Sequence, residues 1–296
     1  MKAVHLLLTL KCLFECDHCF LFCGPEQKEV YSRKFLEEVI EQVGDMRGLE
    51  WIFFEGGEPF LYYPLLLAGI ERAACRGLKT GLVTNGYWTV NEDADMWLEP
   101  LMEAGLSSIS ISSGDFHSDY MGRSANEEGM RISLERTADR LGLDISFLET
   151  VKPRLDEEGG LENGGVMFRG RAAEKLTEGL PPRPPQELDE CPWEDLEDPD
   201  RVHIDPSGRV HLCQGLIIGK VNESTLSDVF VSYSPKDHPL IAPLLKGGPL
   251  ALAEELQYDI GEGYVDACHF CFELRRDLVV AGRFRRYLNP AEVYGL

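Results

Sequence analysis

The stretch Cys12-Leu13-Phe14-Glu15-Cys16-Asp17-His18-Cys19 brings three thiols together within eight residues. Thiols this close in the sequence can converge only on a single metal centre. Three thiolates are one fewer than the four that close an all-cysteine iron–sulfur site, so one position of the centre stays open to a substrate. The alternatives are a zinc site completed by Cys23 or His18, and a set of buried free thiols.

Strands and helices alternate on both sides of this stretch. An apolar strand is predicted directly before it, at 3–10, as in buried parallel sheets. The segment 152–165 is rich in glycine, so a fifth helix should be short or absent there. The alternation predicts an α/β protein with a parallel sheet and right-handed crossovers. Further strands are expected at 51–54, 80–84, 107–112, 143–149 and 166–168, and helices at 32–43 (N-cap Ser32), 64–75, 93–104 and 127–141.

Polar motifs follow several of these strands, and the carboxyl ends of barrel strands are where barrel enzymes place their chemistry. Gly56-Gly57-Glu58-Pro59 follows the second strand. Its glycines let the backbone approach a ligand closely, and the Glu58 carboxylate can accept hydrogen bonds from an ammonium group. Ser112 could bind a ribose or simply form a turn, and Thr84-Asn85-Gly86 reads as a structural turn.

Three more side chains are candidate catalytic or substrate-binding residues at the same, carboxyl end of the strands. Asp115 and His117 would face it if their loop folds over, with His117 as a general base, a substrate ligand or an ordinary surface histidine. Arg171 follows the expected sixth strand, where it could grip a carboxylate with two hydrogen bonds or begin a solvated helix.

The three cysteines and the glycine turn together resemble the radical S-adenosylmethionine (radical SAM) enzymes. The resemblance implies an open, partial (β/α)6 TIM-like barrel over residues 1–177, with a 4Fe–4S cluster on Cys12, Cys16 and Cys19. It also implies S-adenosyl-L-methionine on the fourth iron, and a low-potential electron donor such as flavodoxin or ferredoxin. The family's cofactor contacts would fall on Gly56, Gly57 and Glu58 (methionyl amine), His18 (adenine) and Ser112 (ribose).

A proline-rich, acidic linker at 178–190 is expected to separate a second, small α+β domain at 191–296. A hairpin is predicted around Asp205-Pro206-Ser207-Gly208. The segment resembles the twitch domain, the half-length SPASM auxiliary-cluster domain, although the spacing before Gly208 is slightly long. One auxiliary 4Fe–4S cluster is the preferred reading and structural zinc the competing one, while Cys23 and Cys75 should be buried apolar residues. The ligands would be Cys191, Cys213, Cys268 and Cys271.

Composition limits the partners. The formal net charge of −22 disfavours nucleic acid and anionic membrane surfaces. The sequence contains no apolar run of membrane-spanning length and no visible export signal. Nine cysteines in such a chain favour reduced thiols and metal ligation, hence a cytoplasmic protein.

The resemblance implies radical generation from S-adenosylmethionine and hydrogen abstraction from an unactivated C–H bond. A Gly170-Arg171-Ala172 segment and the auxiliary module favour a peptide or protein side chain as the substrate. The chain's compact size favours oxidation of a small molecule instead. A non-catalytic iron–sulfur or zinc module is the third alternative, but it does not account for the coincidence of the three cysteines with the glycine turn. The sequence names neither the substrate nor the oligomeric state.

Overall fold

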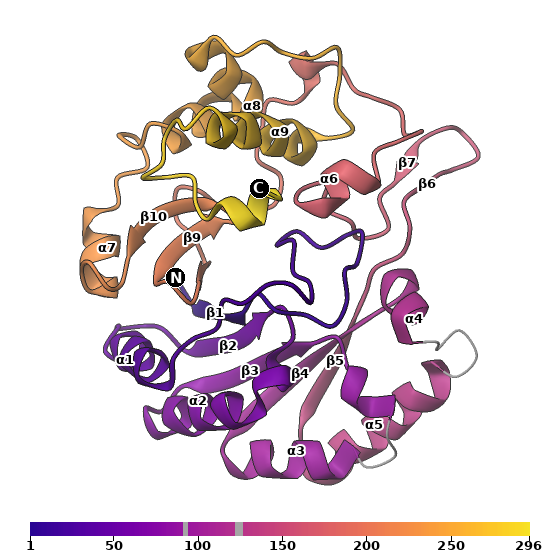
Figure 1. Cartoon of the computed structure of the whole chain (residues 1–296), viewed down its shortest axis with the longest axis vertical. Helices are drawn as coiled ribbons and strands as arrows, with labels where there is room; N and C mark the ends of the chain where they lie inside the picture. Colours follow the sequence, from indigo (N-terminus) through magenta and orange to yellow (C-terminus); the bar gives the residue numbers. More distant parts are fainter. Residues whose placement is uncertain (91–93, 122–126) are drawn as a thin grey trace.

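One eight-stranded sheet organises the protein, in the order β10-β9-β8-β1-β2-β3-β4-β5 (Figure 1). The structure is a computed structural model and describes residues 1–90, 94–121 and 127–296. The strands from β8 to β5 run parallel, whereas β8, β9 and β10 pair antiparallel. The strands are β1 (Ala3–Thr9), β2 (Trp51–Gly56), β3 (Lys79–Thr84), β4 (Leu106–Ser113), β5 (Asp144–Glu149), β8 (Arg201–Ile204), β9 (Arg209–Cys213) and β10 (Leu216–Lys220).

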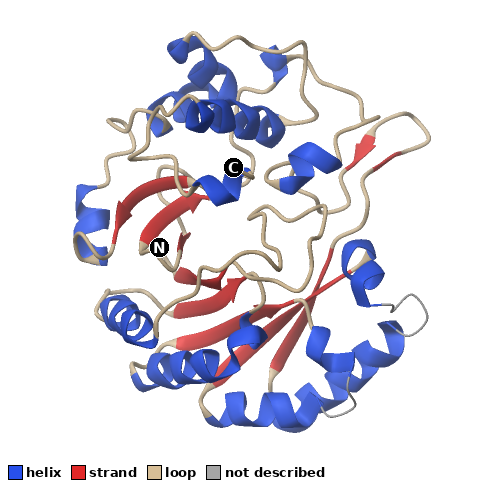
Figure 2. Ribbon diagram, viewed as in Figure 1, coloured by secondary structure: helices blue, strands red, loops and turns tan. Residues whose placement is uncertain are grey.

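Helices cover the outer face of the parallel strands β1 to β5 (Figure 2). The first begins where the sequence predicts, because the Ser32 hydroxyl accepts a hydrogen bond from the Phe35 amide at 3.2 Å. The α/β class and the first five strands are confirmed. The expected start of the third helix, Asp93, lies outside the described residues. The helices on this face are α1 (Arg33–Gly44), α2 (Tyr63–Cys75), α3 (Ala94–Glu103) and α5 (Glu127–Leu141).

Successive side chains along each strand point alternately to the helix-covered outer face of the sheet and to its opposite face. In β1, Val4, Leu6 and Leu8 have no exposed surface, and they point toward the helices. On β2, Phe54 does the same, and α2 approaches it so closely that a Cβ on Gly69 would lie 2.7 Å from its ring. The opposite face, here called the inner face, carries the residues between these positions, of which His5, Phe53 and Glu55 are partly exposed and Leu7 is buried.

The predicted sixth strand at 166–168 is wrong, because these residues lie in an irregular segment. The sixth parallel strand is β8, which pairs with the other edge of β1 from Ala3↔Arg201 to Leu6↔Ile204. After β5 the chain forms a small antiparallel pair, β6 (Arg154–Leu155) and β7 (Leu161–Glu162). The expectation that no long helix follows β5 is therefore confirmed.

The predicted hairpin is present as β8 and β9. Its turn is fixed by Asp205, whose carboxylate accepts hydrogen bonds from the amides of Ser207 and Arg209 at 2.9 Å each, while Gly208 adopts a φ of 82°. A second domain was expected from residue 191 onward. The strands β8 to β10 of that segment belong to the same sheet as β1 to β5, because β8 is hydrogen-bonded to β1. The remaining elements are α6 (Arg171–Lys175), η3 (Pro185–Glu187), α7 (Leu226–Ser232), α8 (Ile241–Leu256), α9 (Ala267–Val280) and η4 (Ala291–Tyr294).

No helix among residues 1–90, 94–121 and 127–296 has the length and apolar character needed to cross a membrane. Cys23 is buried, as expected from the sequence. Cys75 is not: it ends α2 with an exposed side chain, because the last turn of that helix reaches solvent.

The continuous sheet makes a testable prediction about stability. Ile204 in β8 is fully buried, so Ile204→Ala should lower the free energy of unfolding by about 2–5 kcal/mol. In a Trp193→Phe background, the fluorescence of the other three tryptophans, at 51, 88 and 97, reports on the first half of the chain. The unfolding transition followed by this fluorescence should have its midpoint at a lower urea concentration in Ile204→Ala, because β8 pairs with β1.

The control is Val231→Ala, since Val231 is 84% exposed and should change stability by less than about 0.5 kcal/mol. An unshifted tryptophan transition in Ile204→Ala would mean that the two halves unfold independently.

Candidate functional site

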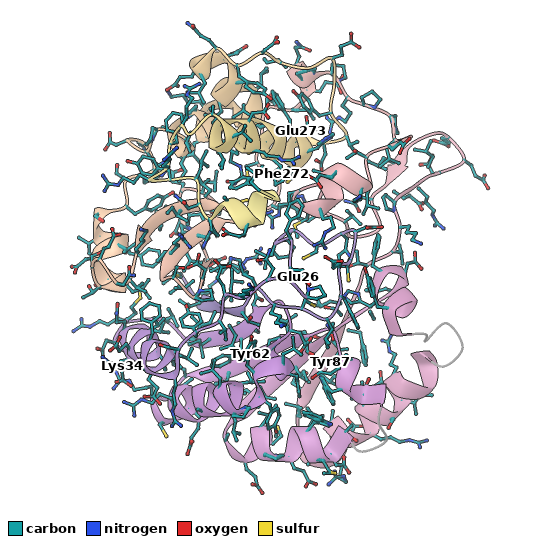
Figure 3. All side chains as sticks on the ribbon, viewed as in Figure 1. Glu26, Lys34, Tyr62, Tyr87, Phe272 and Glu273 are labelled. Carbon is teal, nitrogen blue, oxygen red and sulfur yellow. The ribbon has the colours of Figure 1, made fainter. Side chains whose placement is uncertain are left out.

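The loop between β1 and α1, here called the cysteine loop (residues 10–32), is held against the glycine turn after β2. The amide of Gly57 donates to the Thr9 carbonyl at 2.7 Å, and that of Glu58 donates to the Lys11 carbonyl at 2.9 Å. A Cβ on Gly57 would lie only 2.0 Å from the Lys11 oxygen. Glycine is therefore required at this position for the chain to pass beside the start of the cysteine loop. Glu26 marks this loop in Figure 3, between the sheet and α9.

Glu58 joins the ends of β2 and β3. Its side chain is fully buried, and its carboxylate accepts hydrogen bonds from the Phe60 amide at 3.0 Å, the Thr84 hydroxyl at 2.8 Å and the Asn85 amide at 2.8 Å. Burial raises the pKa of this carboxyl group to about 7, although the three hydrogen bonds lower it in part. Glu58 thus caps the short turn η1 (Pro59–Tyr62) and orders the loop after β3.

Asn85 contacts the site although the sequence pointed to a structural turn. Its side-chain amide donates to the Cys12 sulfur at 3.5 Å, and its main-chain amide bonds Glu58. The available signal was its position directly after β3, at the same edge of the sheet as the cysteines. Asn85 is therefore both a turn residue and a neighbour of the first cysteine.

Of the three predicted ligands among the four cysteines of the loop, Cys12 and Cys16 are buried and Cys19 is half-buried. Burial raises the pKa of the Cys12 thiol to about 12 and also raises that of Cys16. The Cys19 thiol has a lowered pKa, chiefly because Cys23 hydrogen-bonds to it. A thiolate at Cys12 or Cys16 therefore needs a compensating cation or metal centre.

The spacing of the sulfur atoms argues against a single ion. Sulfurs bound to one zinc ion at about 2.3 Å can be no more than about 4.6 Å apart. All nine cysteines lie within the described residues, and no three of their sulfur atoms lie within 4.8 Å of one another. Neither group of predicted ligands therefore has three sulfur atoms as close together as a single zinc ion requires.

Helix α4 (Asp115–Met121) packs against the cysteine loop from the other side. His18 lies with its ring centroid 4.6 Å from that of Phe116 and 5.1 Å from that of His117. Burial, followed by the effect of His117, lowers the pKa of His18 to about 3, so its imidazole is neutral. A neutral, flat ring at this position suits a stacking contact better than it suits proton transfer.

The other residues predicted for this end of the sheet, Asp115 and Ser112, come from α4 and β4 respectively. Asp115 accepts a hydrogen bond from the Lys152 amide at 2.9 Å. Ser112 lies on the inner face of β4, on the same side as Ser110. An open cavity of about 500 Å³ lies next to the loop, lined by Asp17, Phe116, Tyr120 and Lys152.

Arg171 has a different environment from the one expected. Its guanidinium donates to the carbonyls of Cys16 at 2.8 Å and Cys23 at 2.9 Å, and its amide donates to the carbonyl of Cys19 at 2.9 Å. These bonds favour a role in shaping the cysteine loop over a grip on a substrate carboxylate. Gly170 before it approaches the loop so closely that a Cβ would lie 2.4 Å from the Phe20 Cα.

The four later cysteines line one cavity of about 360 Å³, although they come from an irregular segment, β9 and α9. The hairpin supplies Cys213, and the first turns of α9 supply Cys268 and Cys271. The sequence analysis grouped these four residues, and the structure brings them to one place. The lining residues are Arg169, Glu190, Cys191, Pro192, Trp193, Glu194, Cys213, Leu244, Pro249, Ala267, Cys268, Cys271 and Arg275.

Two buried arginines also line this cavity, and sequence analysis did not identify them. Arg169 donates to the Cys213 sulfur at 3.1 Å and pairs with Glu194, and Arg275 donates to the same sulfur at 3.6 Å. Two buried cations beside one carboxylate require further negative charge. Thiolates bound to a metal cluster would supply that charge, so these residues fit such a group.

A short polar contact connects the two cysteine groups. Phe20, which follows Cys19, accepts a hydrogen bond at its carbonyl from the Gln214 side chain at 2.6 Å. Gln214 itself follows Cys213, and the Arg169 guanidinium lies 5.2 Å from the Phe20 ring centroid. The segment that carries Cys213 is thus hydrogen-bonded, through Gln214, to the loop that carries the first group.

Known proteins resemble this chain in sequence over part of its length. The sequence model of the radical SAM superfamily matches residues 6–137. The curated "Putative peptide biosynthesis protein YydG" of Bacillus subtilis (strain 168) is 23% identical over 147 residues, which are 49% of this chain and 45% of that protein. The chain therefore matches less than half the length of this relative.

The fold has counterparts among solved structures. "Native anSMEcpe with bound AdoMet and Cp18Cys peptide" has a TM-score of 0.50 at 12% identity, over 95% of this chain and 99% of that one. Streptococcus suis SuiB bound to S-adenosylmethionine has a TM-score of 0.46 at 16% identity, over 90% and 76% of the two chains. The first likeness supports the TIM-like α/β arrangement. Residues 6–137, which match the sequence model of the radical SAM superfamily, contain both the cysteine loop and the glycine turn.

Proposed function

We propose that this protein is a radical SAM enzyme that modifies a side chain of a peptide or protein, with an auxiliary 4Fe–4S cluster. The observation that carries the proposal is the attachment of the three-cysteine loop to the glycine turn by the amides of Gly57 and Glu58. This contact brings Cys12 and the buried Glu58 carboxylate to the carboxyl ends of β1, β2 and β3, which supports an open metal site beside that carboxylate.

Each part of the chain then has a task. Cys12, Cys16 and Cys19 would hold the first 4Fe–4S cluster, and a low-potential donor such as flavodoxin or ferredoxin would reduce it. When bound, the cluster and S-adenosylmethionine together supply a 5′-deoxyadenosyl radical that abstracts a hydrogen atom.

The protein's own residues orient the site. Glu58 would accept hydrogen bonds from the methionyl ammonium, His18 would lie against the adenine, and Ser112 would bind the ribose. Asn85 and Arg171 hold the cysteine loop in place, through the Cys12 sulfur and the loop carbonyls respectively. Asp115 and His117 stand next to the loop, where they could contact the substrate or move a proton.

A peptide substrate is favoured over a small molecule for two reasons. YydG carries the name of a peptide biosynthesis protein, and anSMEcpe, which shares the fold, is described with a bound peptide. The second cysteine group, Cys191, Cys213, Cys268 and Cys271, would hold an auxiliary cluster that takes an electron from the substrate radical or binds the substrate. Its link to the first group through Gln214 supports a joint role.

The first prediction here concerns metal content. Protein reconstituted without oxygen should hold roughly eight irons and eight sulfides per chain, as two clusters. Replacing Cys12, Cys16 and Cys19 by Ala should leave about half, while Cys75→Ala, at an exposed cysteine, should change nothing. Colorimetric iron and sulfide assays measure both numbers. Stoichiometric zinc in a colourless protein would contradict the proposal.

A second prediction concerns Glu58. Its pKa of about 7 leaves the carboxyl group largely protonated below neutrality, and a neighbouring ammonium would favour the charged form. Binding of S-adenosylmethionine to the reconstituted protein at about pH 6 should therefore release a proton, seen as a dependence of the calorimetric enthalpy on the buffer. Glu58→Gln should abolish this release and weaken binding by about 1.5–3 kcal/mol.

Glu50→Gln is the control for this experiment, because Glu50 is exposed just before β2. Equal affinity for the cofactor in Glu58→Gln and the original protein, with no proton release in either, would limit Glu58 to capping the turn.

A third prediction separates the two clusters. The double variant Cys268→Ala/Cys271→Ala should still cleave S-adenosylmethionine with dithionite, because only the first site is open. With peptides from an extract of the source organism, isolated by ultrafiltration, it should form no modified peptide. The measurements are 5′-deoxyadenosine by chromatography and peptide mass by mass spectrometry.

Folding must be checked in parallel, since loss of a metal site can unfold a small module. Far-UV circular dichroism and a melting curve provide this check, and Cys75→Ala is again the matched control. Full peptide modification by a folded double variant would give the second cluster a purely structural role.

A further inference from the structure

Three side chains that the proposed function does not use converge on the inner face of the sheet. His5 comes from β1, Glu55 from β2 and His203 from β8. His5 Nδ1 lies 3.0 Å from Glu55 Oε2, and His203 Nε2 lies 3.2 Å from Glu55 Oε1. One ligand atom from each residue lies within 4.8 Å of those of the other two. Among the described residues, this is the only group of three histidine, cysteine or acidic side chains that meets this distance.

The strand register creates this group. His5 is paired directly with His203 across the β1–β8 contact, and Glu55 is paired with Leu7 on the other side of β1. Glu55 therefore reaches diagonally over β1 to lie between the two imidazoles. All three side chains share one face of the sheet, because His5 lies between buried Val4 and Leu6, His203 lies between buried Val202 and Ile204, and Glu55 follows buried Phe54.

The surroundings hold the group in place and leave it accessible. The His5 ring stacks on Phe53 with centroids 4.7 Å apart, and Phe53 stacks on Trp51 at 5.5 Å. This aromatic row fixes the orientation of His5. The side chains of His5, Glu55 and His203 retain 14–16% exposure, so an ion can reach them from the inner face.

The geometry points to a new metal site: we propose that His5, Glu55 and His203 bind one divalent first-row transition-metal ion. Two imidazoles and one carboxylate are the protein ligands of many catalytic zinc and non-haem iron sites. Ligand atoms at about 2.0–2.2 Å from one ion are at most about 4.4 Å apart, so the group needs to contract by only a few tenths of an ångström. The remaining positions of the ion face the inner side of the sheet, where water or an oxygen atom of a bound molecule would occupy them.

This site stands apart from the two cysteine groups. Its ligands are nitrogen and oxygen atoms on strands, whereas the clusters would use sulfur atoms on loops and α9. Soft thiolates select iron–sulfur clusters, and imidazole and carboxylate ligands accept ions such as Mn²⁺ that thiolates bind poorly. The inference does not depend on the proposed function, because ion binding can be measured without turnover.

Mn²⁺ is the probe for the test. Reconstituted protein with oxidised, diamagnetic clusters is titrated with Mn²⁺, and free Mn²⁺ is followed by its electron paramagnetic resonance signal. We expect one saturable site per chain, with imidazole nitrogen couplings in the pulsed spectrum of the bound ion. His203→Ala and Glu55→Gln should each weaken this binding about tenfold or more, and His203→Ala should reduce the nitrogen couplings.

Glu71→Gln is the matched control, because Glu71 is an exposed acid on α2 and should leave the site unchanged. Glu55→Gln nearly preserves the side-chain shape, so it protects the test from a folding defect in the histidine variant. Binding without nitrogen couplings would indicate adventitious ions on the acidic surface. That result, or equal binding by all variants, would reduce the group to a hydrogen-bonded cluster and overturn the proposal.

Discussion

The contact between the glycine turn and the end of β1 is the constraint on which the site depends. Two amides of the turn bond the carbonyls of Thr9 and Lys11, and the chains pass so closely that a side chain at Gly57 would overlap the Lys11 oxygen. This contact fixes the direction in which the chain leaves β1, and hence the position of Cys12. The Glu58 carboxylate continues the same network to β3, where Asn85 returns to the Cys12 sulfur. Backbone contacts, which require glycine at position 57, thus position the cysteine loop.

Charge balance organises the second cysteine group. Arg169 and Arg275 are buried beside Cys213, and Glu194 offsets only part of their charge. Such an arrangement is costly unless anions accompany the cations, and cysteines held as thiolates by a cluster would be those anions. The arginines also donate hydrogen bonds to the Cys213 sulfur, and bonds of this kind would adjust the reduction potential of a cluster bound there. The convergence of four cysteines on one cavity and the two buried arginines beside them thus both favour a metal cluster in that cavity.

The two cysteine groups and the histidine–glutamate group share one sheet. β8 is the reason, because it pairs with β1 and so brings the later half of the chain beside the first strand. The hairpin that β8 begins carries Cys213, and its neighbour Gln214 reaches the cysteine loop. His203 joins His5 and Glu55 through the same pairing. One strand contact therefore unites features that lie about two hundred residues apart in the sequence.

The sequence by itself determined the local elements and singled out the two groups of cysteines as candidate metal ligands. Apolar periodicity located β1 to β5 and their helices, the hydroxyl of Ser32 marked a helix start, and Asp205 to Gly208 marked the hairpin, because each of these signals acts over a few neighbouring residues. Cysteine spacing and the glycine turn carried the resemblance to the radical SAM enzymes, whose sequence model matches residues 6–137. Only the tertiary structure decided that 166–168 is not a strand, that β8 is the sixth parallel strand, that Arg171 holds the cysteine loop, and that His5, Glu55 and His203 meet. These outcomes depend on which strand edges pair and which buried carbonyls need donors, and such long-range partners leave no periodic trace in the sequence.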